Sequence, residues 1–504
     1  MNMGQTMHKT PAAPDHTVPM LHSLELMPFV DAMPVPPSLL KATASHASLR
    51  IAMREIHAKV HRDVPATRMW SYGPEALGPV IEARSGHPMS VQWVNNLPVK
   101  HFLPIDHSLH GCGRDIPDVR TCVHVHGARV PTKDDGHPED WFTPGNSRTS
   151  HYPLEQESAT LWFHDHAMGI NRLNHYAGLF GMFWLRDEQE DALHLPNGKY
   201  ELPLVLYDRD FTTDGQLFYP TSGDPEHPWV SEFTADAILV NGKIRPYLEV
   251  EPRLYRFRTV VAANSRFFGL TLSTGASLVQ IGSDQGLLSA AVEVPRLNIA
   301  PGERADLLID FSKHAGEKIH LRTGALDILE FRVAARTGAP VASLPNNIRS
   351  IPRTPETAAT VTRTITLNEY QDKAQNSMLM LLNRKHWHEP VTERPRLNST
   401  EIWEFVNQTE DTHPMHLHLV RFQILDRRPF DTFQYLMQKE MRFQGPAEAP
   451  APNEQGWKDI VHCPPGMVTR IIVKFEGYTG DYLYHCHILE HEANDMMRPF
   501  EVIA

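Results

Sequence analysis

Apolar and polar residues alternate along much of the chain, in short segments that glycine, proline and aspartate interrupt. Examples are 204–211 (LVLYDRDF), 247–260 (YLEVEPRLYRFRTV), 298–311 (NIAPGERADLLIDF) and 467–487 (MVTRIIVKFEGYTGDYLYHCH). A period of two is typical of half-buried strands. The 41 prolines argue against long helices, since proline removes a backbone donor and breaks a helix interior. The pattern predicts an all-β protein built from sandwiches.

Two polar stretches divide this pattern into thirds. They are the charged segment 186–203 and the Pro, Asn and Thr-rich segment 343–364. We expect an N-terminal extension at 1–20, domains at 21–190, 191–345 and 366–504, and a linker at 346–365. The chain of 504 residues, 41% of them hydrophobic, is long enough for three such cores.

The amino-acid composition limits the classes of partner that we expect the protein to bind. The formal net charge of −12 disfavours nucleic acid and anionic membranes, so a small molecule is the expected partner. The chain contains no run of about 18 apolar residues, so we expect no membrane-spanning helix. The N-terminus lacks a basic region followed by an apolar core, which predicts no secretory signal and a cytoplasmic, cell-surface or spore-surface location. The four cysteines, Cys112, Cys122, Cys463 and Cys486, argue against a disulfide framework. A Cys112–Cys122 bridge is the alternative to free thiols, which we expect.

Histidine pairs are more frequent than chance allows. Thirty histidines give about two H-x-H matches at random. The chain has five, at His124/His126, His164/His166, His386/His388, His416/His418 and His485/His487. The flanks of His386/His388 are polar and a proline follows, so we interpret that pair as a surface turn.

The other four pairs have a geometric meaning on strands. Side chains at i and i+2 point to the same face, so His485 and His487 share one site while Cys486 faces another behind them. Two His, one Cys and a weak axial Met form an electron-transfer copper site. Cys486, His491 and Met496 supply three of these, and His413 is free to supply the fourth.

These motifs resemble those of the multicopper oxidases. HVHG (124–127), HDH (164–166), HPMHLH (413–418) and HCHILEHEANDMM (485–497) stand in the family's order. The likeness is greatest to the bacterial branch of spore-coat laccase, phenoxazinone synthase and bilirubin oxidase, and it extends to segments 29–37, 134–142, 240–258 and 418–431. It implies three cupredoxin-like Greek-key sandwiches, with a type 1 copper in the third and a trinuclear cluster between the first and third.

The resemblance also implies which residues bind each of the copper ions. Type 1 copper takes His413, Cys486, His491 and axial Met496; type 2 copper takes His124 and His416; one type 3 copper takes His126, His164 and His487; the other takes His166, His418 and His485. Glu492 and Asp135 are expected to supply or relay protons to reduced oxygen species. Four copper ions are therefore expected.

The implied activity is that of a laccase. Phenols or aromatic amines give up single electrons beside His491, the electrons pass through Cys486, and four of them reduce dioxygen to two waters. Bilirubin oxidase, o-aminophenol oxidase and cuprous oxidase of the same family are alternatives. A non-enzymatic copper carrier would leave the N-terminal H-x-H pairs unexplained, and a structural coat protein with decayed sites should lack some ligands.

Other residues are expected to be structural. Met497 is interpreted as core, because only one of two adjacent methionines can face the copper. We expect no ligand role for His107, His110, His175 or His462, and we interpret His8, His16 and His22 as part of the extension. The middle domain has none of the motifs, so its expected part is spacing and packing, with loops that line the substrate entrance.

Overall fold

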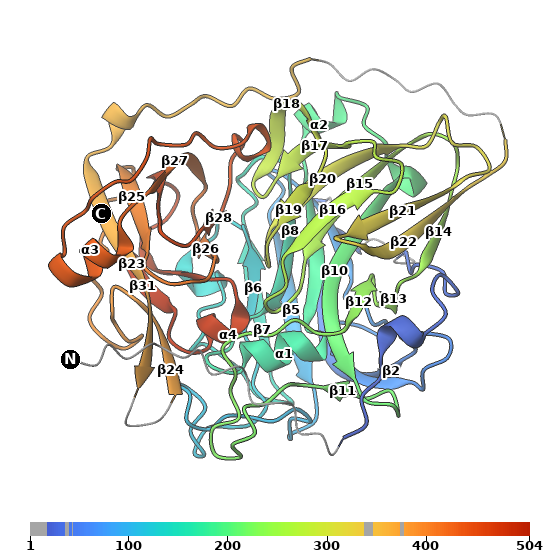
Figure 1. Cartoon of the computed structure of the whole chain (residues 1–504), viewed down its shortest axis with the longest axis horizontal. Coiled ribbons are helices and arrows are strands. Elements are labelled where there is room, and N and C mark those ends of the chain that lie inside the picture. Colours follow the sequence, from blue (N-terminus) through green and yellow to red (C-terminus); the bar gives the residue numbers. More distant parts are fainter. Residues whose placement is uncertain (1–17, 36–39, 43, 337–345, 373–376) are drawn as a thin grey trace.

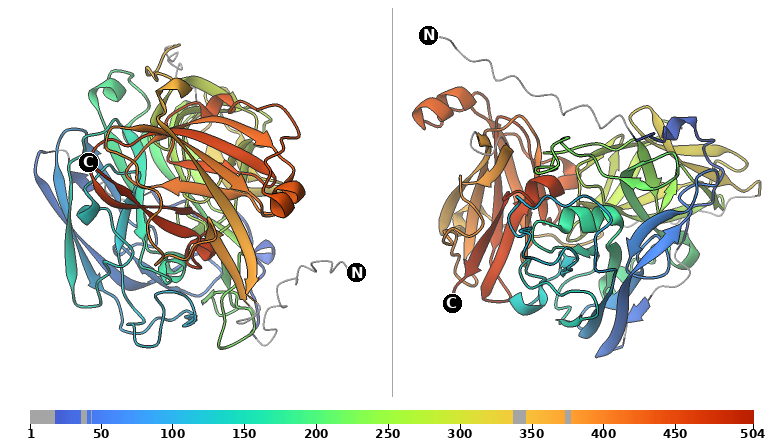
Figure 2. Two further views of the ribbon diagram at one scale, coloured as in Figure 1. Left: turned by 90° about the vertical axis from the view of Figure 1, so that its left-hand side faces the viewer. Right: turned by 90° about the horizontal axis from the view of Figure 1, so that it is seen from below.

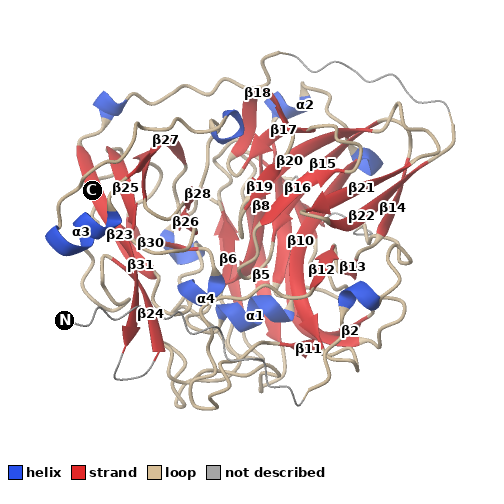
Figure 3. Ribbon diagram, in the orientation of Figure 1, coloured by secondary structure: helices blue, strands red, loops and turns tan. Residues whose placement is uncertain are grey.

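A computed structural model of the chain describes residues 18–35, 40–42, 44–336, 346–372 and 377–504. Most of the predicted extension (1–17, with His8 and His16) and the last residues of the predicted second domain (337–345) lie outside these ranges. Strands dominate and the helices are short (Figure 3). The prediction of an all-β protein is confirmed. No helix among the described residues is long and apolar enough to cross a membrane.

The first sandwich is built from residues 40–186. Its five-stranded sheet has the order β1 (Leu40–Ala42), β4 (Val80–Arg84), β9 (Phe180–Arg186), β8 (Ala159–Asp165), β6 (Val123–His126). Its four-stranded sheet has the order β3 (Thr67–Ser71), β2 (Ala47–Ala58), β5 (Met89–Asn96), β7 (Ser147–Tyr152). Helices α1 (Asn171–Ala177) and α2 (Glu188–Asp191) flank β9 in the chain.

The second sandwich is built from residues 201–333. One sheet has the order β13 (Lys243–Ile244), β12 (Ala237–Val240), β10 (Glu201–Phe211), β15 (Leu254–Val261), β20 (Arg304–Asp310), β17 (Leu278–Ser283), β18 (Gly286–Val294), with β11 (Leu217–Phe218) paired to β10. The other has the order β14 (Tyr247–Val250), β22 (Leu326–Val333), β21 (Lys318–Thr323), β16 (Phe268–Leu272), β19 (Leu297–Ile299).

The third sandwich is built from residues 361–502. Its sheets have the orders β24 (Ser377–Leu382), β23 (Val361–Asp372), β25 (Thr400–Asn407), β29 (Met467–Lys474), β27 (Phe422–Pro429) and β28 (Ile460–Cys463), β26 (His413–Leu417), β30 (Gly480–Cys486), β31 (Met497–Val502). Helices α3 (Thr432–Gln438) and α4 (Leu489–Glu492) and five short 3-10 helices complete the described elements: Ser23–Glu25, Thr132–Asp134, Gly198–Tyr200, Glu356–Ala358 and Pro452–Glu454.

The three sandwiches pack against one another (Figures 1 and 2). One continuous hydrophobic cluster includes Trp93 of the first, Phe257 of the second and Trp403 of the third. Strands β6, β8 and β26 are buried along their whole length, because one face packs on its own core and the other faces a neighbouring sandwich. The exact domain limits stay a prediction.

Candidate metal centre

Strand pairing brings histidines from distant segments together. In the first sandwich β6 pairs with β8, and His124 lies directly opposite His164. In the third sandwich β26 pairs with β30, and His416 lies opposite His485. Because β6 and β26 lie side by side where the first and third sandwiches meet (Figure 1), both sets of side chains reach one space.

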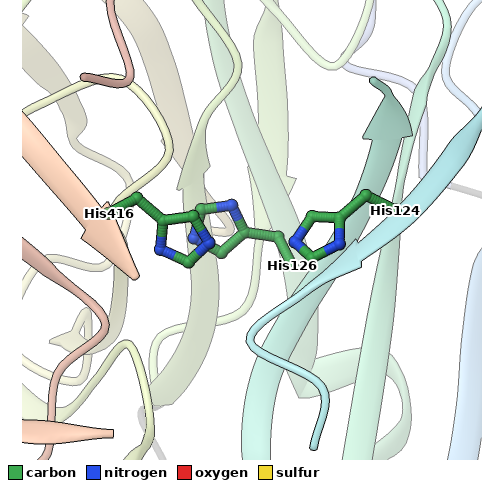
Figure 4. A group of neighbouring side chains, drawn as sticks. All are labelled: His124, His126 and His416. Carbon is green, nitrogen blue, oxygen red and sulfur yellow. The ribbon is translucent and has the colours of Figure 1, made fainter. Parts of the chain in front are cut away.

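We call the resulting group the eight-histidine cluster: His124, His126, His164, His166, His416, His418, His485 and His487. All eight are buried. His126, His164 and His487 have ring nitrogens within 4.8 Å of one another, and so do His166, His418 and His485. His124, His126 and His416 form a third such group, and Figure 4 shows His126 between the other two.

Several ring nitrogens of this cluster have no hydrogen-bond partner among the described residues. They are Nε2 of His124, His164 and His416, Nδ1 of His126 and His166, and both nitrogens of His487. A buried polar atom without a partner is costly, so it calls for an explanation. Burial lowers the pKa of His164 to about 3 and holds those of His124, His126, His416, His418 and His487 well below the ordinary value. Neutral imidazoles with free nitrogens fit copper well.

The opposite ring nitrogen is anchored in most of these histidines. Nδ1 of His124 donates to the Asp135 carbonyl at 2.6 Å, and Nδ1 of His164 donates to the Asp165 carbonyl at 3.0 Å. The Nδ1 of His416 donates to the Asp459 carbonyl at 2.8 Å. Such bonds fix the tautomer and aim the free nitrogen at the centre of the cluster.

A second group, here called the cysteine site, consists of His413, Cys486 and His491. The Cys486 Sγ lies 3.5 Å from His413 Nδ1 and 3.8 Å from His491 Nδ1, and these two nitrogens are 3.3 Å apart. Burial favours the neutral thiol, but hydrogen bonds from the two histidines lower the pKa of Cys486 to about 7. A thiolate is therefore accessible near neutral pH, as a soft metal ligand requires.

Both histidines of the cysteine site are also held from outside. Thr409 Oγ1 lies 2.7 Å from His413 Nε2, and Glu232 Oε2 accepts from His491 Nε2 at 2.9 Å. Each ring therefore keeps Nδ1 turned toward Cys486.

The two adjacent methionines occupy different places. Met496 is fully buried, its amide donates to the His491 carbonyl, and its carbonyl accepts from the Cys486 amide, each at 3.0 Å. Met497 packs instead in a small cluster with Met168, Trp387 and Leu483. The backbone of Met496 is thus tied to the cysteine site and Met496 is part of the main hydrophobic cluster, whereas Met497 packs in the separate small one.

Short paths connect the cysteine site to the cluster. Cys486 stands between His485 and His487 in the chain, and His485 Nδ1 donates to the Cys486 carbonyl at 3.0 Å. The thiol points toward His413 and His491 while the neighbouring imidazoles join the two three-histidine groups of the cluster. Backbone bonds and one hydrogen bond separate the two centres.

The two carboxylates predicted from the sequence, Glu492 and Asp135, are buried and touch the cluster. Glu492 lies 3.2 Å from His485 Nδ1 and 3.5 Å from His166 Nε2, and it accepts from Asn171 Nδ2 at 2.5 Å. Burial raises the pKa of Glu492, but the charges of these histidines outweigh it and lower the pKa overall. Asp135 Oδ2 accepts from His418 Nδ1 at 2.8 Å, and burial raises its pKa.

The remaining histidines bond elsewhere. His386 and His110 both contact the Asp495 carboxylate, at 2.7 and 3.3 Å. His107, His175 and His462 bond to the Cys112 carbonyl, Asn264 and Glu303. Neither these nor His388 belong to any of the compact metal-type groups found among the described residues. All four cysteines are free.

Sequence reasoning missed several residues around the sites, notably Glu232 and Asp459. Asp459 Oδ1 accepts from His126 Nε2 at 3.1 Å. Each is a single acidic residue without a motif, and 259 and 333 positions separate these carboxylates from their histidines. No local signal could have found them.

A cavity of about 1090 Å³ opens beside the cysteine site. Aromatic side chains line much of it: Phe218, Phe233, Phe267 and Phe268. Glu232 and Asp411 line it as well. Because Glu232 bonds to His491, this side chain connects the cavity to the edge of a buried imidazole.

Comparison with known proteins identifies the family. Two models described as multicopper oxidase match residues 354–504 and 116–190. The chain is 43% identical to laccases of Bacillus stratosphericus, over 95% of this chain and 100% of that protein, and of Bacillus subtilis (strain 168), over 95% and 99%. It is 34% identical to the multicopper oxidase LPR1 of Arabidopsis thaliana, over 95% and 93%.

Solved structures of a laccase and of a multicopper oxidase have a fold similar to that of this chain. The laccase of Pediococcus acidilactici aligns with a TM-score of 0.77 at 26% identity, covering 95% of this chain and 96% of that one. The McoA multicopper oxidase of Aquifex aeolicus aligns with a TM-score of 0.76 at 28% identity, covering 94% and 99%. These matches confirm the cupredoxin-like fold and, with the histidine clusters, copper as the cofactor. The chain therefore belongs to the multicopper oxidase family, as a laccase-like member.

Proposed function

We propose that this oxidase takes single electrons from small aromatic donors, phenols or aromatic amines, in the cavity beside His491. The observation that carries this proposal is the aromatic-lined cavity whose Glu232 bonds directly to His491 Nε2. Aromatic walls favour planar rings through edge and face contacts. The Glu232 carboxylate lies where a phenol hydroxyl or an amine can donate a hydrogen bond to it.

We assign the cysteine site, with Met496, as the holder of one copper and the eight-histidine cluster as the holder of three. Copper in these sites supplies one-electron redox chemistry and, at the cluster, the four-electron reduction of dioxygen. The support for this assignment is the set of buried, neutral imidazoles with unpartnered nitrogens and the acidic Cys486 thiol. The chain between Cys486 and His485 or His487 is the proposed route for electrons.

Glu492 and Asp135 are proposed to manage protons. Glu492 is fully buried and contacts histidines of one three-histidine group, and Asp135 bonds to His418 of the same group. A buried carboxylate can carry a proton across hydrogen-bond distance, and Asp135, whose pKa is raised, holds one more readily than Glu492, whose pKa is lowered. The cellular location stays a prediction.

A second candidate donor is a small cation such as cuprous ion. It is favoured by Glu232 and Asp411, two carboxylates that line the cavity. These carboxylates make the end of the cavity near His491 negative. Bilirubin and o-aminophenols remain in the set to be tested, since the cavity is large enough for either.

Initial rates of dioxygen uptake with each donor test the proposal. We expect phenols and aromatic amines to give the highest kcat/KM, with Phe233→Ala reducing it for aromatic donors only. A Phe233→Ala variant that slows cuprous ion as much as phenols would show that the aromatic wall does not select the donor. A faster reaction with cuprous ion than with any aromatic donor would replace the proposal by the second candidate.

A further inference from the structure

A buried carboxylate joins the middle sandwich to the eight-histidine cluster. Asp459 lies directly before β28 and is fully buried. Its Oδ1 accepts from His126 Nε2 at 3.1 Å, and its backbone carbonyl accepts from His416 Nδ1 at 2.8 Å. His126 Nδ1 and His416 Nε2 have no partner among the described residues. Asp459 therefore selects the tautomer in which each histidine offers its other nitrogen to the cluster.

Two side chains of the middle sandwich hold this carboxylate. Arg304, in β20, donates from both terminal nitrogens, with Nη1 2.7 Å from Asp459 Oδ1 and Nη2 bonded to Oδ2. Gln285, between β17 and β18, donates from Nε2 to Asp459 Oδ2 at 2.6 Å and to the Gly127 carbonyl at 3.0 Å. A two-pronged guanidinium contact fixes the orientation of a carboxylate as well as its charge.

Arg304 is itself anchored in two sandwiches. Its Nε donates to the Thr160 carbonyl of β8 at 3.0 Å, and its Nη2 donates to the Asp284 carbonyl at 3.0 Å. A buried ion pair adds little net stability, because removing both charges from water offsets their attraction. Holding His126 and His416 in a fixed orientation therefore explains the Arg304–Asp459 pair better than a gain in folding stability does.

The glycine of the HVHG motif fits the same arrangement. Gly127 follows His126 with φ of +87°. A Cβ at this position would lie 2.8 Å from Arg304 Nη2, Asp459 Oδ2 and Gln285 Nε2. These three groups therefore occupy the space that a side chain would need, directly beside the first histidine pair.

We propose that Arg304 and Gln285 are positioning residues for the eight-histidine cluster, acting through Asp459. The middle sandwich is then part of the structure that holds the trinuclear copper, beyond the spacing and packing expected from the sequence. This inference rests on the proposed ligand set. None of the three residues bonds to His413, Cys486 or His491, so the cysteine site should be insensitive to them.

Asp459→Asn, Arg304→Lys and Gln285→Leu test the proposal in the copper-loaded enzyme. Copper retained per chain is measured against a graded copper chelator, together with the type 2 copper resonance and the blue absorption of the cysteine site. We expect copper affinity at the cluster to fall about 10- to 100-fold in Asp459→Asn, the usual effect of disturbing an outer hydrogen bond to a ligand, because one amide oxygen cannot accept from His126, Arg304 and Gln285 together. Arg304→Lys keeps the positive charge but loses the two-pronged contact with Asp459, so the copper affinity should fall less in this variant. The blue absorption should persist in all three.

Arg258→Lys is the matched control. Arg258 is equally buried and bonds to Glu201, Glu190 and Thr160, without a histidine among these partners. Unchanged cluster affinity in Asp459→Asn and Gln285→Leu, or equal loss in Arg258→Lys and Arg304→Lys, would overturn the inference. A wild-type chain that retains no copper at the cluster would instead refute the proposed ligand set. Gln285→Leu removes no charge, so it remains informative if the charged variants fail to fold.

Discussion

Glu232→Gln perturbs the point where electrons are proposed to enter. The amide keeps an oxygen that can accept from His491 Nε2 but removes the negative charge. A hydrogen bond to a charged group contributes about 1.5–3 kcal/mol. Because the Glu232 side chain is 39% exposed, solvent screening reduces this to about 1 kcal/mol. The charge favours oxidised copper, so its loss should raise the reduction potential of the cysteine site by about 40 mV, given about 59 mV per tenfold change for one electron.

Spectroelectrochemical titration of the blue absorption measures this shift. Asp236→Asn is the control, since Asp236 lines the same cavity but its carboxylate accepts from the Ser23 amide. The rise should be much smaller in Asp236→Asn, because its charge is not bonded to His491. An unchanged or lower potential in Glu232→Gln, or an equal rise in the control, would refute the reasoning.

Three further predictions concern single residues. Cys486→Ser should abolish the blue absorption and the oxidase activity while the eight-histidine cluster keeps its copper, because a hydroxyl replaces the thiolate poorly as ligand and electron path; a variant that stays blue would contradict the assignment. Met496→Leu should cost below about 1.5 kcal/mol in stability, keep the blue colour and raise the potential, because a coordinating thioether favours oxidised copper. An unchanged or lower potential in this variant would contradict the axial role of Met496. Burial raises the pKa of Glu201, but Arg258, Arg256 and Arg186 outweigh it and lower the pKa to about 2 in the folded chain. Its ionised form then contributes about 3 kcal/mol above about pH 5, which is lost as the pH falls through 2. The thermal midpoint of Glu201→Gln should therefore lie below that of the wild type at pH 7 and approach it toward pH 2; a gap that does not narrow would count against this.

The sequence was sufficient for the residue types at the sites and for the all-β class. Period two places His124 and His126 on one face, and that face is where the structure has them. The sequence could not predict the strand register, that is, which residues of paired strands lie opposite each other. His124 lies opposite His164 because β6 pairs with β8 as it does, and such pairing depends on packing across the sandwich.

The alternation of apolar and polar residues predicts the burial of one strand wrongly. The alternation in segment 204–211 predicts a half-buried strand, but nearly all of β10 is buried. Asp208 pairs with Arg266, and Arg209 donates to the Tyr176 carbonyl, so charged side chains on this strand are satisfied inside the protein. Asp459, Arg304 and Glu232 belong to the same class of buried or bridging charges, whose partners are set by tertiary packing alone.

Copper content measured together with dioxygen consumption tests the central claim most directly. With a phenolic donor in known amount, the copper-loaded chain should contain four copper ions and oxidise four equivalents of donor per dioxygen, without releasing hydrogen peroxide. A chain that binds a single copper and consumes no dioxygen, or that releases peroxide at two electrons per dioxygen, would contradict the account.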